Sequence, residues 1–223
     1  LVDGFRSIQN LTGGAGQDTF NVTGGGLSGS ISGGGEVDTI TVGAILTVGG
    51  TISGDDGNDV LTFQNGAQVT GVVSGNAGMD TFNIDAGATV TASFDGGADD
   101  DTFNLDTGTL IGTITGGGDT GDVINGGNIS TLYRIDGADS GVLDTRITSF
   151  TGVANLTGGS NQDVFRFSGN TASLSGMIDG GSNSDDFLQL SDNDDSLTLN
   201  VGDAGDATVN GITTAFVSIE NIN

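Results

Sequence analysis

Two stretches decide the fold: Val73-Ser-Gly-Asn-Ala-Gly-Met-Asp-Thr-Phe-Asn-Ile84 and, 21 residues later, Phe94-Asp-Gly-Gly-Ala-Asp-Asp-Asp-Thr-Phe-Asn-Leu105. Each has an apolar residue, a turn with glycine, an aspartate, and then apolar residues that alternate with Thr and Asn. The aspartate recurs at intervals of 20, 21, 21, 21 and 21 residues, as Asp18, Asp38, Asp59, Asp80, Asp101 and Asp122. A fixed short period of this kind indicates a repeat architecture.

The alternation of apolar and small polar residues within each unit is typical of strands that face one core. We read each unit as two short strands and two turns. So short a unit cannot bury its apolar face alone, so neighbouring units must stack and pair their strands in parallel. The sequence therefore predicts an all-β fold, a right-handed parallel β-solenoid of about ten coils of ~21 residues. Inward positions should form an apolar column of Phe20, Ile40, Leu61, Phe82 and Phe103.

The period loosens after Asp122, because 41 residues pass before the next clear aspartate of the series, Asp163. The range 126–155 contains the only tyrosine, Tyr133, and two of the four arginines. We interpret this range as a degenerate coil or an insertion within one continuous solenoid domain, 1–223. Asp185 or Asp186 resumes the series.

A longer phrase occurs three times, at Phe5-Arg-Ser-Ile-Gln-Asn-Leu11, Phe150-Thr-Gly-Val-Ala-Asn-Leu156 and Phe216-Val-Ser-Ile-Glu-Asn-Ile222. The first two copies lead into a new coil, and the third is followed only by Asn223. We therefore expect both ends to be cut from, or continued by, a longer array. The partners predicted are neighbouring repeats of the same polypeptide, or further copies associating end to end.

Composition restricts the function further. Four basic residues stand against 29 acidic ones, and the net charge of −25 argues against nucleic acid as a partner. The chain contains no run of about 18 apolar residues, which is the length that a membrane-spanning helix needs. The chain is rich in glycine and has no cysteine. In this it resembles the repeat regions of large secreted bacterial adhesin and filament proteins, a likeness that implies an extracellular or cell-surface location.

The turns resemble the glycine- and aspartate-rich nonapeptides of the repeats-in-toxin family, as in Gly54-Asp-Asp-Gly-Asn-Asp59. The resemblance implies Ca²⁺ between turns stacked in successive coils. One turn per coil matches here, whereas the family's nonapeptides run in tandem, so we expect one acidic edge rather than two. The candidate calcium ligands are the acidic residues of these turns: Asp18, Asp38, Asp55, Asp56, Asp59, Asp80, Asp99, Asp100, Asp101 and Asp122.

Two alternatives accompany this calcium hypothesis. Each recurring aspartate could instead accept backbone N–H bonds within its own turn, with no metal. Outward Thr and Asn residues, such as Thr39 and Thr41, could form an ice-binding array, but hydrogen-bonded ladders along the sheet are favoured.

Catalysis is not expected. Parallel β-helices include enzymes that act on polysaccharides, but this chain has no histidine or lysine to serve as a base. The predicted function is a structural or adhesive extracellular module, either a stiff spacer or a filament subunit. A calcium-dependent β-roll of a secreted protein is the alternative.

Overall fold

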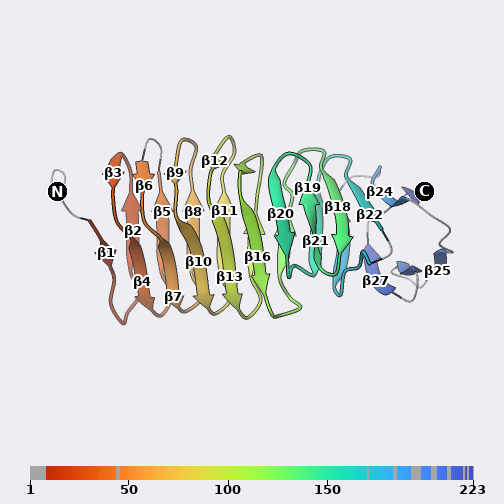
Figure 1. Cartoon of the computed structure of the whole chain (residues 1–223), viewed down its shortest axis with the longest axis horizontal. Coiled ribbons are helices and arrows are strands. Elements are labelled where there is room, and N and C mark those ends of the chain that lie inside the picture. The colour runs from red at the N-terminus through yellow and green to blue at the C-terminus, as the bar shows by residue number, and fades with distance from the viewer. Residues whose placement is uncertain are drawn as a thin grey trace.

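The computed structural model describes residues 9–43, 46–169, 171–182, 185–191, 197–201, 205–209, 212–217, 219 and 221–222. Within these residues the fold is all-β, and the coils stack in parallel along the longest axis of the molecule (Figure 1). The predicted β-solenoid is therefore confirmed. It has about eight turns of ~21 residues, rather than the ten expected, because part of the chain forms antiparallel strands.

Two long sheets make up the body. The first sheet has twelve strands and the second has eleven. Up to residue 125, the chain alternates between them. The first sheet receives β1 (Leu11–Thr12), β4 (Ile31–Gly35), β7 (Ile52–Asp56), β10 (Val72–Ala77), β13 (Ser93–Ala98) and β16 (Thr113–Gly117). The second receives β2 (Thr19–Val22), β5 (Thr39–Val42), β8 (Val60–Phe63), β11 (Thr81–Ile84), β14 (Thr102–Asn104) and β17 (Val123–Asn125).

A third, shorter side closes each of the first five coils, so the prediction of two strands per unit is corrected. This side is formed by β3 (Gly25–Leu27), β6 (Leu46–Val48), β9 (Gln68–Val69), β12 (Thr89–Val90) and β15 (Thr109–Leu110). Its inward residues, such as Val69 and Val90, are buried. Thr70 and Gly71 separate β9 from β10, so the chain turns there from the third side into the first sheet.

The core is the predicted apolar column. Phe20, Ile40, Leu61, Phe82, Phe103 and Ile124 are partners in register across six successive strands of the second sheet. The rings of Phe82 and Phe103 stack with their centroids 4.8 Å apart. Phe94 of the first sheet approaches Phe82 from the other side, at 5.5 Å. The two sheets thus share one apolar interior.

Part of the range 126–155 forms an antiparallel meander of three strands. These are β18 (Leu132–Gly137), β19 (Ser140–Leu143) and β20 (Ile147–Thr151), and all three belong to the first sheet. β20 pairs with β16, while β18 pairs with the later strand β22 (Val164–Ser168). The meander therefore inserts three strands between coils, which accounts for the 41-residue gap in the aspartate series.

The meander also exchanges the two sheets. Before it, the glycine-rich half of each repeat lies in the first sheet and the half after the aspartate lies in the second. After it, the glycine-rich strands β21 (Asn155–Gly159) and β23 (Met177–Gly181) lie in the second sheet. The strands after the aspartates, β22 and β24 (Phe187–Ser191), lie in the first. The meander lies in the first sheet where the next glycine-rich strand would otherwise have been. That glycine-rich strand, β21, therefore falls in the second sheet.

A second meander follows in the second sheet, formed by β25 (Leu197–Val201), β26 (Gly205–Val209) and β27 (Ile212–Val217). β27 pairs with β23, and β28 (Asn221–Ile222) returns to the first sheet beside β24. Phe150 and Phe216, which begin two copies of the repeated phrase, thus lie in the last strand of a meander. The phrase marks the exit from a meander into the opposite sheet. The first copy of the phrase begins within residues 1–8, which lie outside the described residues.

Candidate functional site

The recurring aspartates form a column at the corner where the chain passes from the first sheet to the second. We call Asp18, Asp38, Asp59, Asp80, Asp101 and Asp122 the aspartate column. All except the half-buried Asp18 are at most 1% exposed. Each buried Oδ1 accepts a hydrogen bond from the backbone N–H of the equivalent aspartate one coil earlier. These bonds are Asp18 N to Asp38 2.7 Å, Asp38 N to Asp59 2.6 Å, Asp59 N to Asp80 2.7 Å, Asp80 N to Asp101 2.8 Å and Asp101 N to Asp122 2.8 Å.

The column differs from the alternative in which each aspartate accepts backbone N–H bonds within its own turn. In-turn bonds from backbone N–H groups reach the side chains of Asp18, from Gly14 at 2.7 Å, and Asp163, from Gly159 at 2.9 Å. The recurring contact runs between coils instead. Each carboxylate therefore ties its own turn to the turn before it, which makes the column part of the stacking.

A second column starts after the first meander. Asp163 accepts a 2.8 Å bond from the backbone of Thr131, and its own N–H donates 2.7 Å to Oδ1 of Asp186. These residues precede β18, β22 and β24, all in the first sheet. This column therefore stands at the corner where the chain passes from the second sheet to the first. The expectation of a single acidic edge is corrected, because exchanging the sheets moves the repeat to another corner.

The second carboxylate oxygen faces a glycine. Oδ2 of Asp38, Asp59, Asp80, Asp101 and Asp122 is buried and has no hydrogen-bond partner. A Cβ added to Gly33, Gly54, Gly75, Gly96 or Gly116, respectively, would overlap this oxygen. For four of the five glycines, the same Cβ would also crowd a backbone carbonyl oxygen: that of Gly54 for Gly33, Gly96 for Gly75, Gly116 for Gly96 and Gly152 for Gly116. The missing Cβ thus leaves a small chamber in which two acceptor oxygens meet.

The environment of four members of the column disfavours negative charge. Burial, opposed in part by the backbone hydrogen bonds and reinforced by neighbouring carboxylates, raises the pKa of Asp80 to about 7 and of Asp101 to about 8. The same balance raises the pKa of Asp122 to about 6. It also raises that of Asp59. In the second column, burial raises the pKa of Asp163 to about 6.

The remaining calcium candidates are not among the buried carboxylates. Asp55 is the second-last residue of β7 and has a φ of 76°. Its carboxylate accepts hydrogen bonds from the hydroxyls of Ser32 and Ser53. Asp56, Asp99 and Asp100 are exposed. Among the described residues, no three acidic side chains gather in an arrangement that could hold a metal ion. The structure therefore arranges the buried candidates one coil apart, in a column rather than around one point.

The outward face of the second sheet carries the expected polar ladder. The amide of Asn104 donates to Oδ1 of Asn83 at 2.9 Å, and the amide of Asn125 donates to Oδ1 of Asn104 at 2.7 Å. Asn83 continues the row to the hydroxyl of Thr62 at 3.3 Å. Because these amides are used along the sheet, they stabilise the stacking of the coils.

The sequence did not indicate a role for Arg146, whose side chain is buried beside the meander. Its guanidinium donates to the carbonyl oxygens of Leu105, Asp106, Gly108 and Gly126 and to the hydroxyl of Thr131. It therefore clamps two coil turns to the inserted strands. The only available signal was the rarity of arginine in this chain.

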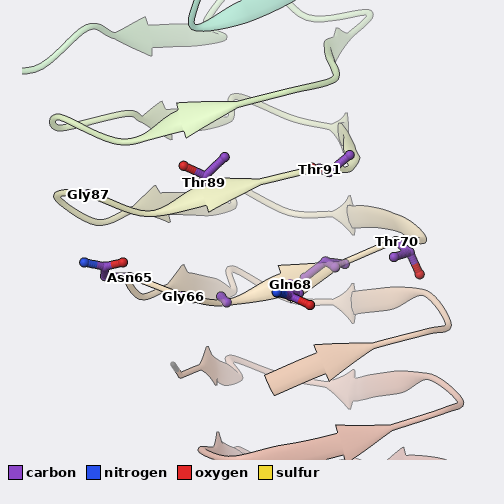
Figure 2. A pocket seen from close by; sticks show the side chains of 9 residues that line it. Asn65, Gly66, Gln68, Thr70, Gly87, Thr89 and Thr91 are labelled. Carbon is purple, nitrogen blue, oxygen red and sulfur yellow. The ribbon is translucent and has the colours of Figure 1, made fainter. Parts of the chain in front are cut away.

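A groove of about 420 Å³ opens on the third side. It lies between the coil of β9, which contributes Asn65, Gln68 and Thr70, and the coil of β12, which contributes Thr89 and Thr91 (Figure 2). β9 and β12 belong to separate small sheets. No acidic or basic side chain lines the groove, so its lining offers hydrogen bonds but no acid–base chemistry.

Comparison with known proteins adds no name to this geometry: no family model, no curated protein and no solved structure matches the chain. Over the described residues, the structure contains no helix that is long and apolar enough to cross a membrane.

Proposed function

We propose that the chain is a non-catalytic structural module of an extracellular or cell-surface protein, a stiff rod that acts as a spacer or as a filament subunit. The observation that supports this best is the continuity of the two sheets along the long axis. Twelve strands at the usual separation of neighbouring strands extend over roughly 50 Å. Every coil in this rod adds length without adding a new kind of site.

Stiffness follows from how the coils are joined. Bending the rod would stretch backbone ladders in two sheets and open the apolar column at Ile40, Leu61 and Phe82. It would also separate the carboxylates of the aspartate column from the N–H groups of the preceding coil. Because each coil contacts only its neighbours, stability adds up along the stack. A rod of this kind can be lengthened by repeats without redesign.

The surface is consistent with a contact role. Along seven coils, the outward residues of the second sheet are uncharged Thr, Asn and Val, for example Thr81 and Asn83. The acidic residues of the turns, such as Asp56 and Asp100, lie at the corners instead. An uncharged sheet face of this highly acidic molecule can approach another surface with less electrostatic repulsion than the acidic corners.

End-to-end continuation has a specific geometric basis at β2, the outermost strand of the second sheet in the described part. The N–H of Thr39 in β5 donates to the carbonyl oxygen of Asp18 at 3.0 Å. The equivalent N–H of Thr19 in β2 therefore points away from the stack. A further coil, from the same polypeptide or from a second copy, would accept this bond.

Analytical ultracentrifugation and electron microscopy over a range of concentrations test the proposal. We expect the purified chain to form straight rods that lengthen by association. Thr19→Pro should stop growth at this edge, since proline lacks the outward N–H. Thr19→Val, which keeps it, should associate like the wild type. A chain that stays monomeric at high concentration would refute the filament role, and a compact particle in small-angle scattering would refute the rod.

A further inference from the structure

The starting observation is the chamber beside the glycine that faces each buried aspartate of the column. Oδ2 of Asp80 and the carbonyl oxygen of Gly96 both border the space left by the missing Cβ of Gly75. Oδ2 of Asp101 and the carbonyl oxygen of Gly116 meet in the same way beside Gly96. Both oxygens are hydrogen-bond acceptors when the carboxyl is ionised, and two buried acceptors facing each other repel. Each chamber therefore lacks a donor.

We propose that Asp80, Asp101 and Asp122 of the aspartate column are proton sites. In the folded solenoid, each of these three carboxyls is a neutral acid that carries its proton on Oδ2 and donates it to the facing glycine carbonyl of the next coil. The proton comes from solvent, and one O–H bond forms at each carboxyl. Oδ1 continues to accept the N–H of the preceding coil. Each acid then bridges three consecutive coils.

Protonation also removes a conflict between like charges. The charged groups that act on four members of the column are themselves acids: Asp38 and Asp55 for Asp59; Asp59 and Asp99 for Asp80; Asp80, Asp122 and Asp99 for Asp101; Asp119 and Asp100 for Asp122. Charges one coil apart, about 4.8 Å, would repel by roughly 1 to 4 kcal/mol per pair. Asp163 in the second column differs, since Arg146 as well as Asp186 acts on it.

The consequence is a solenoid that takes up protons as it folds. The raised pKa values of Asp80 and Asp101 exceed those of the same groups in the unfolded chain, about 3.9. Between these values the folded state binds more protons than the unfolded state, so stability falls as pH rises. The contribution is fully present below the unfolded pKa and is lost as pH passes through about 7 to 8.

Asparagine provides the sharpest test, because its amide mimics the neutral acid. In Asp101→Asn, Oδ1 can accept the N–H of Asp80 and Nδ2 can donate to the carbonyl of Gly116. We expect the wild-type Tm to fall by roughly 5 °C or more between about pH 5 and about pH 9. Asp101→Asn should have a higher Tm than the wild type at about pH 9 and a shallower dependence on pH. Asp80→Asn should behave in the same way.

The matched control is Asp95→Asn, which removes one acidic charge from the exposed face of β13. It should shift the Tm by a similar amount at both pH values and keep the wild-type slope. A lower Tm of both column variants at about pH 9 would overturn the proposal, because it would mean that a bound cation or a charged carboxylate holds the site. A wild-type Tm that rises with pH over this range would also overturn it.

Infrared spectroscopy in D₂O reads the protonation state directly and does not depend on any variant folding. The wild type at about pH 6 should show the C=O stretching band of protonated carboxyl groups, and this band should weaken in Asp101→Asn but not in Asp95→Asn. A folded wild type without the band at that pH would contradict the proposal.

Discussion

The backbone N–H of Asp80 donates a 2.8 Å hydrogen bond to Oδ1 of Asp101, the equivalent residue one coil later. This contact joins two residues that are 21 positions apart in the sequence, and both side chains are buried. Its repetition along the corner turns a sequence motif into a continuous structural element.

The chamber beside Asp80 depends on the absence of a side chain at Gly75. In Gly75→Ala, the new methyl group would overlap Oδ2 of Asp80 and crowd the carbonyl of Gly96. We expect a loss of about 1–3 kcal/mol in the free energy of unfolding, measured by urea denaturation. Gly118→Ala is the control, because its Cβ would meet no atom within 4 Å. Equal effects of the two changes would show that the chamber is not sterically closed.

The buried guanidinium of Arg146 should be among the most sensitive single sites. Arg146→Met keeps much of the apolar stem but leaves the carbonyls of Leu105, Asp106, Gly108 and Gly126 without this donor. We expect a loss of about 3 kcal/mol, together with faster amide hydrogen exchange in β18–β20. The control is Arg134→Met, because Arg134 makes one exposed ion pair with Asp136 at 3.4 Å. Such a pair contributes about 0–1 kcal/mol. A comparable loss in both variants would contradict the clamp.

Calcium chelation separates a proton-filled column from a calcium-dependent β-roll. Ca²⁺ takes six to eight oxygen ligands, usually with several carboxylates among them, and no three acidic side chains of the described residues gather at one point. We therefore expect EDTA to leave the circular dichroism spectrum and the Tm unchanged. NaCl at matched ionic strength is the control for screening of the net charge of −25. Ca²⁺ at 100 times the Kd of a site would add about 2.7 kcal/mol to the free energy of unfolding. A marked rise in Tm with CaCl₂ but not with NaCl would therefore favour the β-roll.

Much of the fold could be predicted because the local pattern encodes it. The residues from Thr81 to Ile84 alternate outward and inward, and the next coil repeats them in Thr102 to Leu105, so pairing in register follows from matching buried faces. The third side was harder to recognise, because β9 and β12 each span two residues, too few for an alternation to be seen.

The candidate site was predicted in position but not in chemistry. The spacing located the buried aspartates, and the resemblance to calcium-binding turns suggested ions. In the structure, Asp59 and Asp80 point into the corner, with one oxygen on a backbone N–H and the other against a glycine. The direction of a side chain at a turn depends on the backbone angles and on the coil that stacks against it, and a sequence pattern records neither.

By itself, the sequence determined the period, the alternation that makes strands, and the apolar column through Phe82 and Phe103, because these depend on spacing within one coil. Only the tertiary structure decided that the first meander exchanges the sheets, that Asp163 starts a second column at another corner, and that Arg146 clamps the inserted strands. The physical reason is that these features depend on contacts between residues in different coils. Such contacts exist only once the coils have stacked, and stacking encloses each carboxyl of the aspartate column beside a glycine.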